Sequence, residues 1–234
     1  MRPETPAAAG HLVRVSDGTR TRGRLDHNQE LYQLSYAHRA TLNLAAGGRG
    51  GVPCDHPSMS FELGDPVPAF TLTDTAGTAH TVPADDAPPA TVLVVTCNHC
   101  PYVIAWNPRL RAVAEDYVPR DVRMLAINAN DAKRFPADSR GAMKRFVDDQ
   151  NWPIPYLYDE TQGVAKALDA QVTPHVFVLD ADQRLRYRGA PDADHGDPSR
   201  NAQYLRDALD AVLEGLEPLT PDTRPRGCSV KWKG

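Results

Sequence analysis

Hydrophobic residues recur with a regular period through the second, longer part of the chain, and this pattern predicts alternating strands and helices. Residues 69–73 and 78–82 alternate in polarity, which is typical of half-buried strands. Residues 91–96 (TVLVVT) and 122–128 are short runs rich in apolar and β-branched residues, and such runs favour strands buried on both faces. Residues 152–158 predict a further extended segment.

Apolar residues at helical spacing follow these strands. They predict helices over about 97–117, after Ser139, after Thr161 and over about 202–213. Ser139 and Thr161 are side chains that commonly cap helix N-termini. Pro108 lies inside the first predicted helix and is expected to kink or break it.

A closing hairpin completes the pattern, with strands at 176–179 and 185–187 around the polar turn at 180–183. The predicted order is β-β-β-α-β-α-β-α-β-β-α. It indicates an α/β fold with a mixed central sheet and helices on both faces. We therefore expect one domain over residues 59–217, followed by a C-terminal tail at 218–234 whose proline-rich part at 218–225 is solvated.

Residues 1–58 lack a sustained hydrophobic period and include the run Ala-Ala-Gly-Gly-Arg-Gly-Gly at 45–51, so we expect a disordered segment there. A second hypothesis is a spurious extension. Residues 18–36 resemble the peptide obtained when a transfer-RNA gene is translated, in which case Met59 would be the true start.

Composition excludes several classes of protein. Hydrophobic residues make up 41% of the chain and charged residues 24%, as in ordinary globular proteins. Residues 59–234 carry 25 acidic and 19 basic side chains, so no non-specific binding of nucleic acid is expected. The chain lacks both the roughly 20 apolar residues of a membrane helix and the pattern of a secretory signal. We expect a cytoplasmic protein without a membrane partner.

The segment Cys97-Asn98-His99-Cys100 is the main candidate for chemistry. Two cysteines separated by two residues, placed where a buried strand meets a helix, bring their sulfurs close enough to form a disulfide. The free N–H groups of the helix terminus then favour the thiolate of the first cysteine and lower its pKa from about 8.5. Cys97 is the predicted nucleophile, and Cys100 is predicted to resolve the mixed disulfide.

His99 precedes the second cysteine, and its imidazole is expected to add positive potential near Cys97. Stabilising the thiolate stabilises the reduced form. We therefore expect a couple more oxidising than that of thioredoxin, which has a potential of roughly −270 mV.

Several runs carry a resemblance to a known family. Cys-Asn-His-Cys-Pro-Tyr-Val at 97–103, Tyr-Asp-Glu-Thr-Gln at 158–162, and Gly-Cys-Ser-Val-Lys-Trp-Lys at 227–233 occur in the expected order. Residues 62–187 resemble the thioredoxin superfamily, in particular its peroxiredoxin-like branch related to alkyl hydroperoxide reductase and thiol-specific antioxidant proteins. The resemblance implies a thioredoxin-like fold and a thiol-disulfide oxidoreductase. It implies protein or small-molecule disulfide and thiol substrates, a thioredoxin- or glutathione-type electron donor, and no cofactor.

The resemblance also implies a cis-proline opposite the cysteines, and Thr173-Pro174 occupies that place in the sequence. The backbone of Thr173 would then be available for strand-like pairing with a substrate chain. Thr173 and Pro174 are therefore predicted substrate-binding residues.

The sequence departs from its relatives at two positions. His175 follows the proline where relatives often carry Asp, and Val172 stands where some carry Cys. Cys228 therefore has no cysteine at that position to pair with. We expect Cys228 and Cys54 to be free thiols, with an accessory role for Cys228 left open.

Three other functions compete with disulfide exchange. Peroxiredoxins carry a Thr three residues before the reactive cysteine, and Val94 occupies that position before Cys97. A peroxidase therefore remains the first alternative, since thiolates react with peroxide unaided. A non-catalytic interaction domain is a further alternative.

Metal binding is a minor alternative. Cys97, His99, Cys100 and His175 could approach one another and handle copper, but no second pair of ligands completes a zinc site. We therefore assign no metal ligands.

Overall fold

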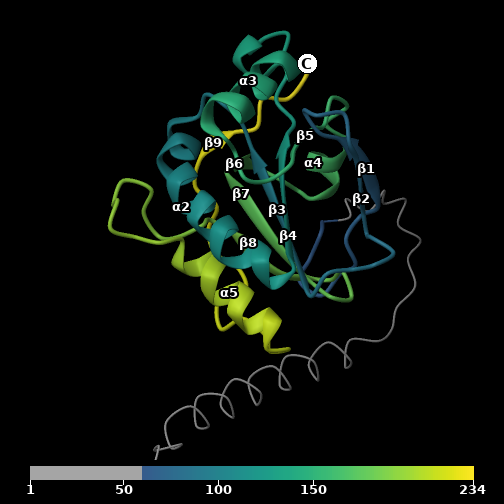
Figure 1. Ribbon diagram of the computed structural model, residues 1–234, viewed down its shortest axis with the longest axis vertical. Coiled ribbons are helices and arrows are strands. Elements are labelled where there is room, and N and C mark those ends of the chain that lie inside the picture. The colour runs from purple at the N-terminus through teal and green to yellow at the C-terminus, as the bar shows by residue number, and fades with distance from the viewer. Residues whose placement is uncertain (1–59) are drawn as a thin grey trace, which may run out of the picture. The chain divides into compact units, whose positions relative to one another are not determined.

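The computed structural model describes residues 60–234, and these form a mixed five-stranded sheet with helices packed against it (Figure 1). The hypotheses about residues 1–58 lie outside the described part of the chain. Within the described part, no helix is long and apolar enough to cross a membrane.

The elements agree closely with the predicted periodicity. The strands are β1 (Phe70–Thr73), β2 (Ala79–Val82), β3 (Ala90–Thr96), β4 (Val122–Asn128), β5 (Tyr156–Tyr158), β6 (Val172–Thr173), β7 (His175–Asp180), β8 (Leu185–Gly189) and β9 (Cys228–Ser229). The α-helices are α2 (Pro101–Tyr117), α3 (Arg140–Gln150), α4 (Gly163–Ala167) and α5 (Gln203–Leu213). Short 3-10 turns occupy Val118–Arg120 and Pro136–Asp138.

The central sheet has the order β5-β4-β3-β7-β8, with β3 in the middle. β3 runs parallel to β4 and antiparallel to β7, so the sheet is mixed. All seven residues of β3 are buried, as expected for a strand covered on both faces. This arrangement confirms the predicted α/β class and thioredoxin-like architecture.

Alternate side chains of β3 enter two different hydrophobic cores. Val92 and Val94 pack in the core that holds buried residues of α2, α3 and α5. Leu93 and Val95 pack in the core that holds α4 and part of the N-terminal hairpin. Helices therefore cover both faces of the sheet, as predicted, and Figure 1 shows α2 and α5 on one side with α4 on the other.

Two local expectations are corrected in part. The helix α2 is not broken at Pro108, and its apolar side chains on both sides of the proline, such as Trp106 and Leu110, are buried in the core. The N-cap of α4 is Gln162 in the left-handed region, one residue after the expected Thr161, whose hydroxyl accepts the N–H of Gly163 at 3.2 Å. Ser139 does cap α3, since its hydroxyl accepts the N–H of Ala142 at 3.4 Å.

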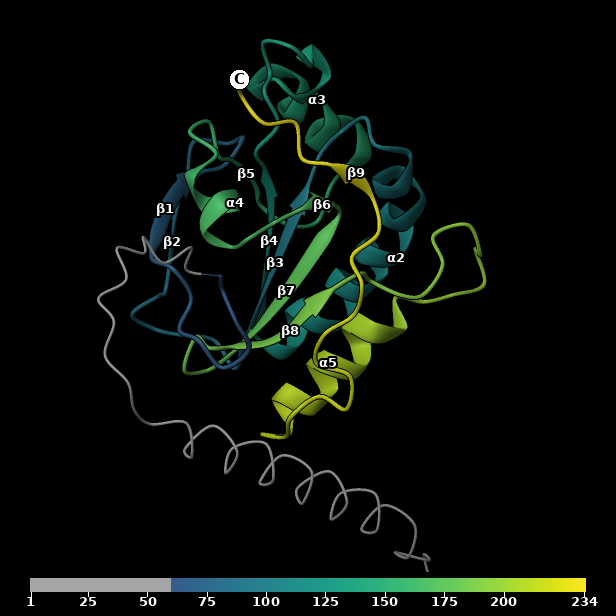
Figure 2. The ribbon, with the colours of Figure 1, turned by 180° about the vertical axis from the view of Figure 1, so that it is seen from behind.

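The C-terminal segment packs on the domain, and even its proline-rich part at 218–225, which was expected to be solvated, exchanges backbone hydrogen bonds with Arg188 through Pro221 and Thr223. Its strand β9 pairs antiparallel with β6, and both short strands were absent from the predicted order. Val230 is buried in the core beside α4. Figure 2 shows the yellow segment running from α5 past β6 to the C-terminus. The pairing joins residues far apart in sequence, so local periodicity carried no signal for it.

Gly227 makes this close packing possible, and its replacement by Ala tests it. A Cβ at this position would lie 2.1 Å from the backbone oxygen of Thr173, so β9 must move away from β6. We expect Gly227→Ala to expose the bond after Arg226 to trypsin at least about fivefold more, through local opening of the segment. The sheet should stay folded by circular dichroism.

Gly141→Ala is the matched control, because a Cβ there meets only the end of the Arg145 side chain at 3.7 Å. Equal cleavage rates after Arg226 in both variants would contradict the packing of β9 against β6.

Candidate functional site

The two cysteines of the C-x-x-C segment lie at the end of the central strand. Cys97 directly follows β3, and Cys100 is the N-cap residue of α2, whose first residue is Pro101. Both cysteines are buried, with 2% and 0% of their surfaces exposed, and they form a small cluster with Val103. The helix thus begins at the late end of the expected range, and the backbone N–H of its N-cap Cys100 still lowers the pKa of Cys97, against the larger effects described below that raise it.

Thr173 contacts both cysteines from the opposite side of the site. Its hydroxyl lies 3.3 Å from the sulfur of Cys97, and its backbone oxygen accepts the thiol of Cys100 at 3.2 Å. The Thr173-Pro174 peptide bond is cis, as predicted. The structure thus brings Cys97, Cys100 and the predicted substrate-binding pair together.

The thiols of Cys97 and Cys100 differ in pKa. The hydrogen bond that Cys97 donates to Cys100 raises the pKa of Cys97, and burial and the charge of Asp138 raise it further. The same bond lowers the pKa of Cys100, and a second bond from Cys228 lowers it again. When protonated, Cys100 instead donates to the Thr173 backbone oxygen. Of the two thiols, Cys100 therefore has the lower pKa, whereas the sequence led us to expect a lowered pKa for Cys97; the assignment of the nucleophile stays a prediction.

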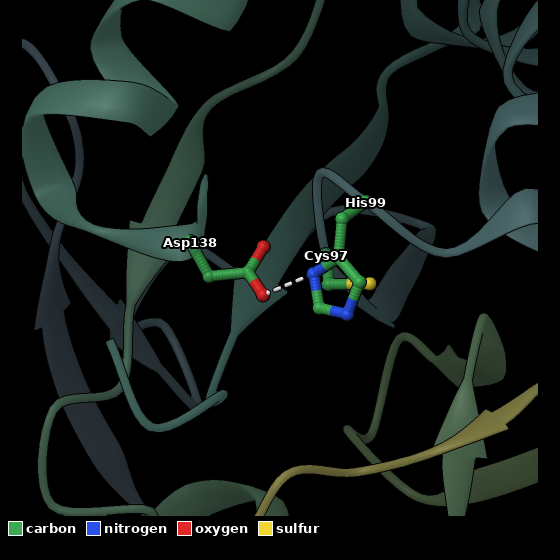
Figure 3. A group of neighbouring side chains, drawn as sticks. All are labelled: Cys97, His99 and Asp138. Carbon is green, nitrogen blue, oxygen red and sulfur yellow. Dashed lines mark ion pairs between the residues drawn. The ribbon is translucent and has the colours of Figure 1, made fainter. Parts of the chain in front are cut away.

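His99 is paired with a buried carboxylate that the sequence did not reveal as part of the site. Its Nδ1 lies 2.7 Å from an oxygen of Asp138, and Figure 3 shows this contact with Cys97 beside the ring. The nitrogen is not aligned for a regular hydrogen bond, so the contact is an ion pair when the imidazole is protonated. The ring also stacks on Phe135, with 5.5 Å between centroids. The predicted effect of His99 on Cys97 stays a prediction.

Asp138 is held in place by a set of amide donors. One oxygen accepts the backbone N–H of Asn98 at 2.7 Å and the side chain of Asn128 at 3.2 Å. The other accepts the side chain of Asn130 at 2.9 Å and faces His99. Asp138 is fully buried, so these donors stabilise a carboxylate that would otherwise be costly to bury. The sequence signal that could have drawn attention to Asp138 is its position directly before Ser139, the predicted helix cap.

The same residues form the cluster that could hold a metal ion among residues 60–234. Ligand atoms of Cys97, His99 and Asp138 lie within 4.8 Å of one another. His175, a candidate ligand by sequence, is not part of this cluster. Both oxygens of Asp138 already accept amide N–H groups, so a metal ion would have to compete with these bonds. The donor set fits a charged hydrogen-bonding pair better than a metal site.

Cys228 also belongs to the cysteine cluster, which sequence reasoning left open. Its strand β9 pairs with Thr173, and its half-buried side chain packs against Cys97, Cys100 and Val103. The backbone of Thr173 was predicted to pair with a substrate chain, and the protein's own C-terminal segment therefore occupies that edge. Cys54 lies outside the described residues.

Two polar residues near the site hold the C-terminal segment. Asn130 accepts the backbone N–H of Lys231 at 2.8 Å through its side-chain oxygen, and the N–H of Asp131 donates to the Lys231 backbone oxygen at 2.8 Å. Both residues are buried at the end of β4. They position backbone and do not contact the sulfurs.

The chain is similar to proteins of a known family. The family model described as Redoxin matches residues 62–205, which is more than half of the chain and includes both cysteines. The chain belongs to the Redoxin family. Membership makes this redoxin a thiol-based redox protein of the thioredoxin superfamily.

Solved structures agree with the assignment of this redoxin. An uncharacterized conserved protein from Geobacillus kaustophilus is 40% identical, covers 75% of this chain and 94% of its own, and superposes with a TM-score of 0.71. A hypothetical protein from Sinorhizobium meliloti 1021 is 34% identical over 75% of this chain and 97% of its own, with a TM-score of 0.70.

A more distant structure shows the same fold. A protein from Chlorobium tepidum, named as the thiol:disulfide interchange protein DsbE, is 18% identical over 66% of this redoxin and 99% of its own chain, with a TM-score of 0.53. None of the curated proteins matches the redoxin.

His175 provides a test of the burial beside the site. It is 3% exposed, and burial, together with the charge of Arg188, lowers its pKa to about 4. In the unfolded chain a histidine titrates near 6.5, so the unfolded state binds more protons between these values. The free energy of unfolding should therefore fall by about 2 kcal/mol through this group as the pH drops from about 7 to 4.5.

The measurement is urea unfolding of the parent and of His175→Asn at both pH values. The variant keeps an acceptor for the N–H of Gln171, which bonds Nδ1 of His175 at 3.4 Å, but carries no titrating ring. Its loss of stability at low pH should be smaller than that of the parent. An identical loss in both chains would contradict a neutral, buried His175.

Proposed function

We propose that this redoxin is a thiol-disulfide oxidoreductase that exchanges disulfides through Cys97 and Cys100. The observation that carries the proposal is the pair of buried sulfurs held by Thr173, one by its hydroxyl at 3.3 Å and one by its backbone oxygen at 3.2 Å. Two thiols of unequal pKa in contact provide one nucleophile and one resolving thiol. We place this exchange in a reducing compartment such as the cytoplasm, where a close pair of cysteines is more often catalytic than structural.

The exchange begins at Cys100. Its thiolate attacks one sulfur of a substrate disulfide, forming a mixed disulfide and expelling the other sulfur as a thiolate that takes up a proton. Cys97 then loses its proton and attacks the sulfur of Cys100, which forms the Cys97–Cys100 disulfide and releases the second substrate thiol. Two electrons pass to the substrate disulfide, and the enzyme dithiol is oxidised. A thioredoxin- or glutathione-type donor restores the dithiol.

His99 and Asp138 serve the second step. Cys97 must ionise, although its contacts with Cys100 and Asp138 raise its pKa. His99 lies within the 4.8 Å cluster that contains the Cys97 sulfur, and Asp138 holds the imidazole there. We assign His99 as the group that accepts the proton of Cys97, with Asp138 stabilising the imidazolium.

Paired cysteine variants test the proposal and the order of attack. In a Cys54→Ser, Cys228→Ser background, Cys97→Ser leaves Cys100 as the one cysteine, and Cys100→Ser leaves Cys97. With oxidised glutathione at pH 7, we expect the glutathione adduct to form on Cys100 at least about tenfold faster than on Cys97, because reactivity follows the thiolate. Intact-mass spectrometry measures both rates.

Reduction of insulin disulfides with dithiothreitol as donor measures turnover. In the Cys54→Ser, Cys228→Ser background, the chain with Cys97 and Cys100 should be active, and addition of Cys97→Ser or Cys100→Ser should each lower activity at least about 100-fold, because the mixed disulfide is no longer resolved or formed. A faster adduct on Cys97 would reverse the order of attack. Full activity in either of these variants would overturn dithiol exchange.

Peroxide reduction is the second candidate function, and the Thr173 hydroxyl is the observation that favours it. The peroxiredoxin Thr is absent three residues before Cys97, but Thr173 supplies a hydroxyl to the same sulfur from across the sheet. Cys97 as thiolate would attack one peroxide oxygen and break the O–O bond, which converts Cys97 to a sulfenic acid and releases the other oxygen as hydroxide or alkoxide that takes up a proton. Cys100 would then form the disulfide and release water.

Thr173→Val separates the two functions, because it removes the hydroxyl with little change in volume. If the hydroxyl supports peroxide reduction, peroxide consumption with a thioredoxin donor should fall at least about tenfold, as for loss of a hydrogen bond to a charged group. Insulin reduction should fall less. Thr71→Val, on an exposed part of β1, is the control. Equal losses of both activities would leave peroxide reduction without support.

A further inference from the structure

Cys228 lies where a strand-bound cysteine reaches the two active-site sulfurs. Residue pairing between β6 and β9 places Cys228 opposite Thr173, the residue that holds both Cys97 and Cys100. The Cys228 side chain packs in the same buried cluster as these cysteines. The hydroxyl of Thr173 also donates to the backbone oxygen of Cys228 at 3.5 Å. The two thiols of the C-x-x-C segment and the thiol of the distant strand β9 therefore meet at Thr173.

The segment that carries Cys228 is held on the domain at both sides of the cysteine. Before it, Gly227 packs so closely on the Thr173 backbone that any side chain would collide. After it, Val230 is buried, and the backbone oxygen of Lys231 accepts the N–H of Asp131 at 2.8 Å and the side chain of Gln162 at 2.9 Å. The position of the Cys228 thiol is thus built by specific contacts.

The protonation of Cys228 depends on Cys100. Burial raises the pKa of Cys228 to about 11, and the hydrogen bond it donates to Cys100 and the charge of Cys100 contribute to this rise. Once Cys100 is part of a disulfide, it carries no charge and this contribution disappears. Cys228 therefore ionises more readily when the active site is oxidised than when it is reduced.

We propose that Cys228 is a third redox-active cysteine of this site, which attacks the sulfur of Cys100 in the Cys97–Cys100 disulfide. The Cys97–Cys100 bond breaks, a Cys100–Cys228 bond forms, and the proton lost by Cys228 passes to the Cys97 thiolate. The exchange is redox-neutral and needs no further oxidant once the first disulfide exists. It rests on the proposed function only in requiring that first disulfide.

The Cys100–Cys228 disulfide would close the site covalently. With Cys228 bonded to Cys100, β9 is tied over Thr173, and Cys97 becomes a free thiol again. A substrate chain that pairs with the same edge of Thr173 has to displace β9, which the disulfide prevents. The oxidised redoxin is thereby held closed until its donor reduces Cys100–Cys228.

Disulfide mapping on the full chain tests the proposal. In a Cys54→Ser background, trypsin yields the peptide 50–109 with Cys97 and Cys100, and the peptide 227–231 with Cys228. After oxidation with diamide at pH 7 and alkylation of free thiols, we expect the two peptides to be linked, with alkylated Cys97. Adding Cys97→Ser should preserve the link, and adding Cys100→Ser instead should reduce it at least about fivefold, because disulfide formation requires close and specific geometry.

Two further variants distinguish failure of the Cys228 proposal from failure of the proposed function. Cys54→Ser, Cys228→Ser must form the Cys97–Cys100 disulfide and reduce insulin if the proposed function holds, whatever the role of Cys228. Gly227→Ala in the Cys54→Ser background keeps the three site cysteines but displaces β9, so the link should decrease while Cys97–Cys100 persists; Gly141→Ala should change neither. A Cys97–Cys100 disulfide with fully alkylated Cys228 in the three-cysteine chain would overturn the proposal.

Discussion

Thr173 is the residue on which the geometry of the site depends, because it touches all three described cysteines through different contacts. Its hydroxyl meets Cys97, its carbonyl oxygen meets Cys100, and its backbone pairs with Cys228. The short strand β6 lies directly before β7, which pairs with the central strand β3. The rigid sheet thus sets the distance between the cysteine segment and Thr173. A small shift at this position would separate every sulfur contact at once.

Charge around the cysteines is distributed asymmetrically. Asp138, which is buried and accepts three amide N–H groups, disfavours a negative charge on Cys97 and attracts the imidazole of His99. Cys100 receives hydrogen bonds from the neighbouring thiols. The buried acid therefore adds to the unequal pKa values of the two thiols, whose largest cause is the hydrogen bond between them, and it holds the imidazole that we propose as the proton acceptor. It limits the effect of His99, since part of the positive potential of the ring is neutralised by its partner.

The sequence predicted those features that local pattern encodes. The buried strands β3 and β4, the helix after Cys100 and the cis bond at Thr173 were correctly assigned, because each depends on neighbouring residues or on recognisable motifs. Asp138 and β9 were not placed in the site, since their contacts span long stretches of sequence and no periodicity marks them. The sequence also carried no sign of the hydrogen bond between the two thiols, which lowers the pKa of Cys100 and raises that of Cys97.

The attachment of β9 to the same chain has a consequence for how the redoxin responds to concentration. A strand that competes from within the molecule has an effective concentration set by the length of chain that tethers it, on the order of millimolar for short flexible connections. Diluting the protein leaves this competitor unchanged, whereas the occupancy of any external peptide falls. Substrates with weak affinity for the strand edge are thereby excluded even at high abundance. A substrate would then pair with the Thr173 edge only if its affinity for this edge is high enough to displace the chain's own C-terminal strand.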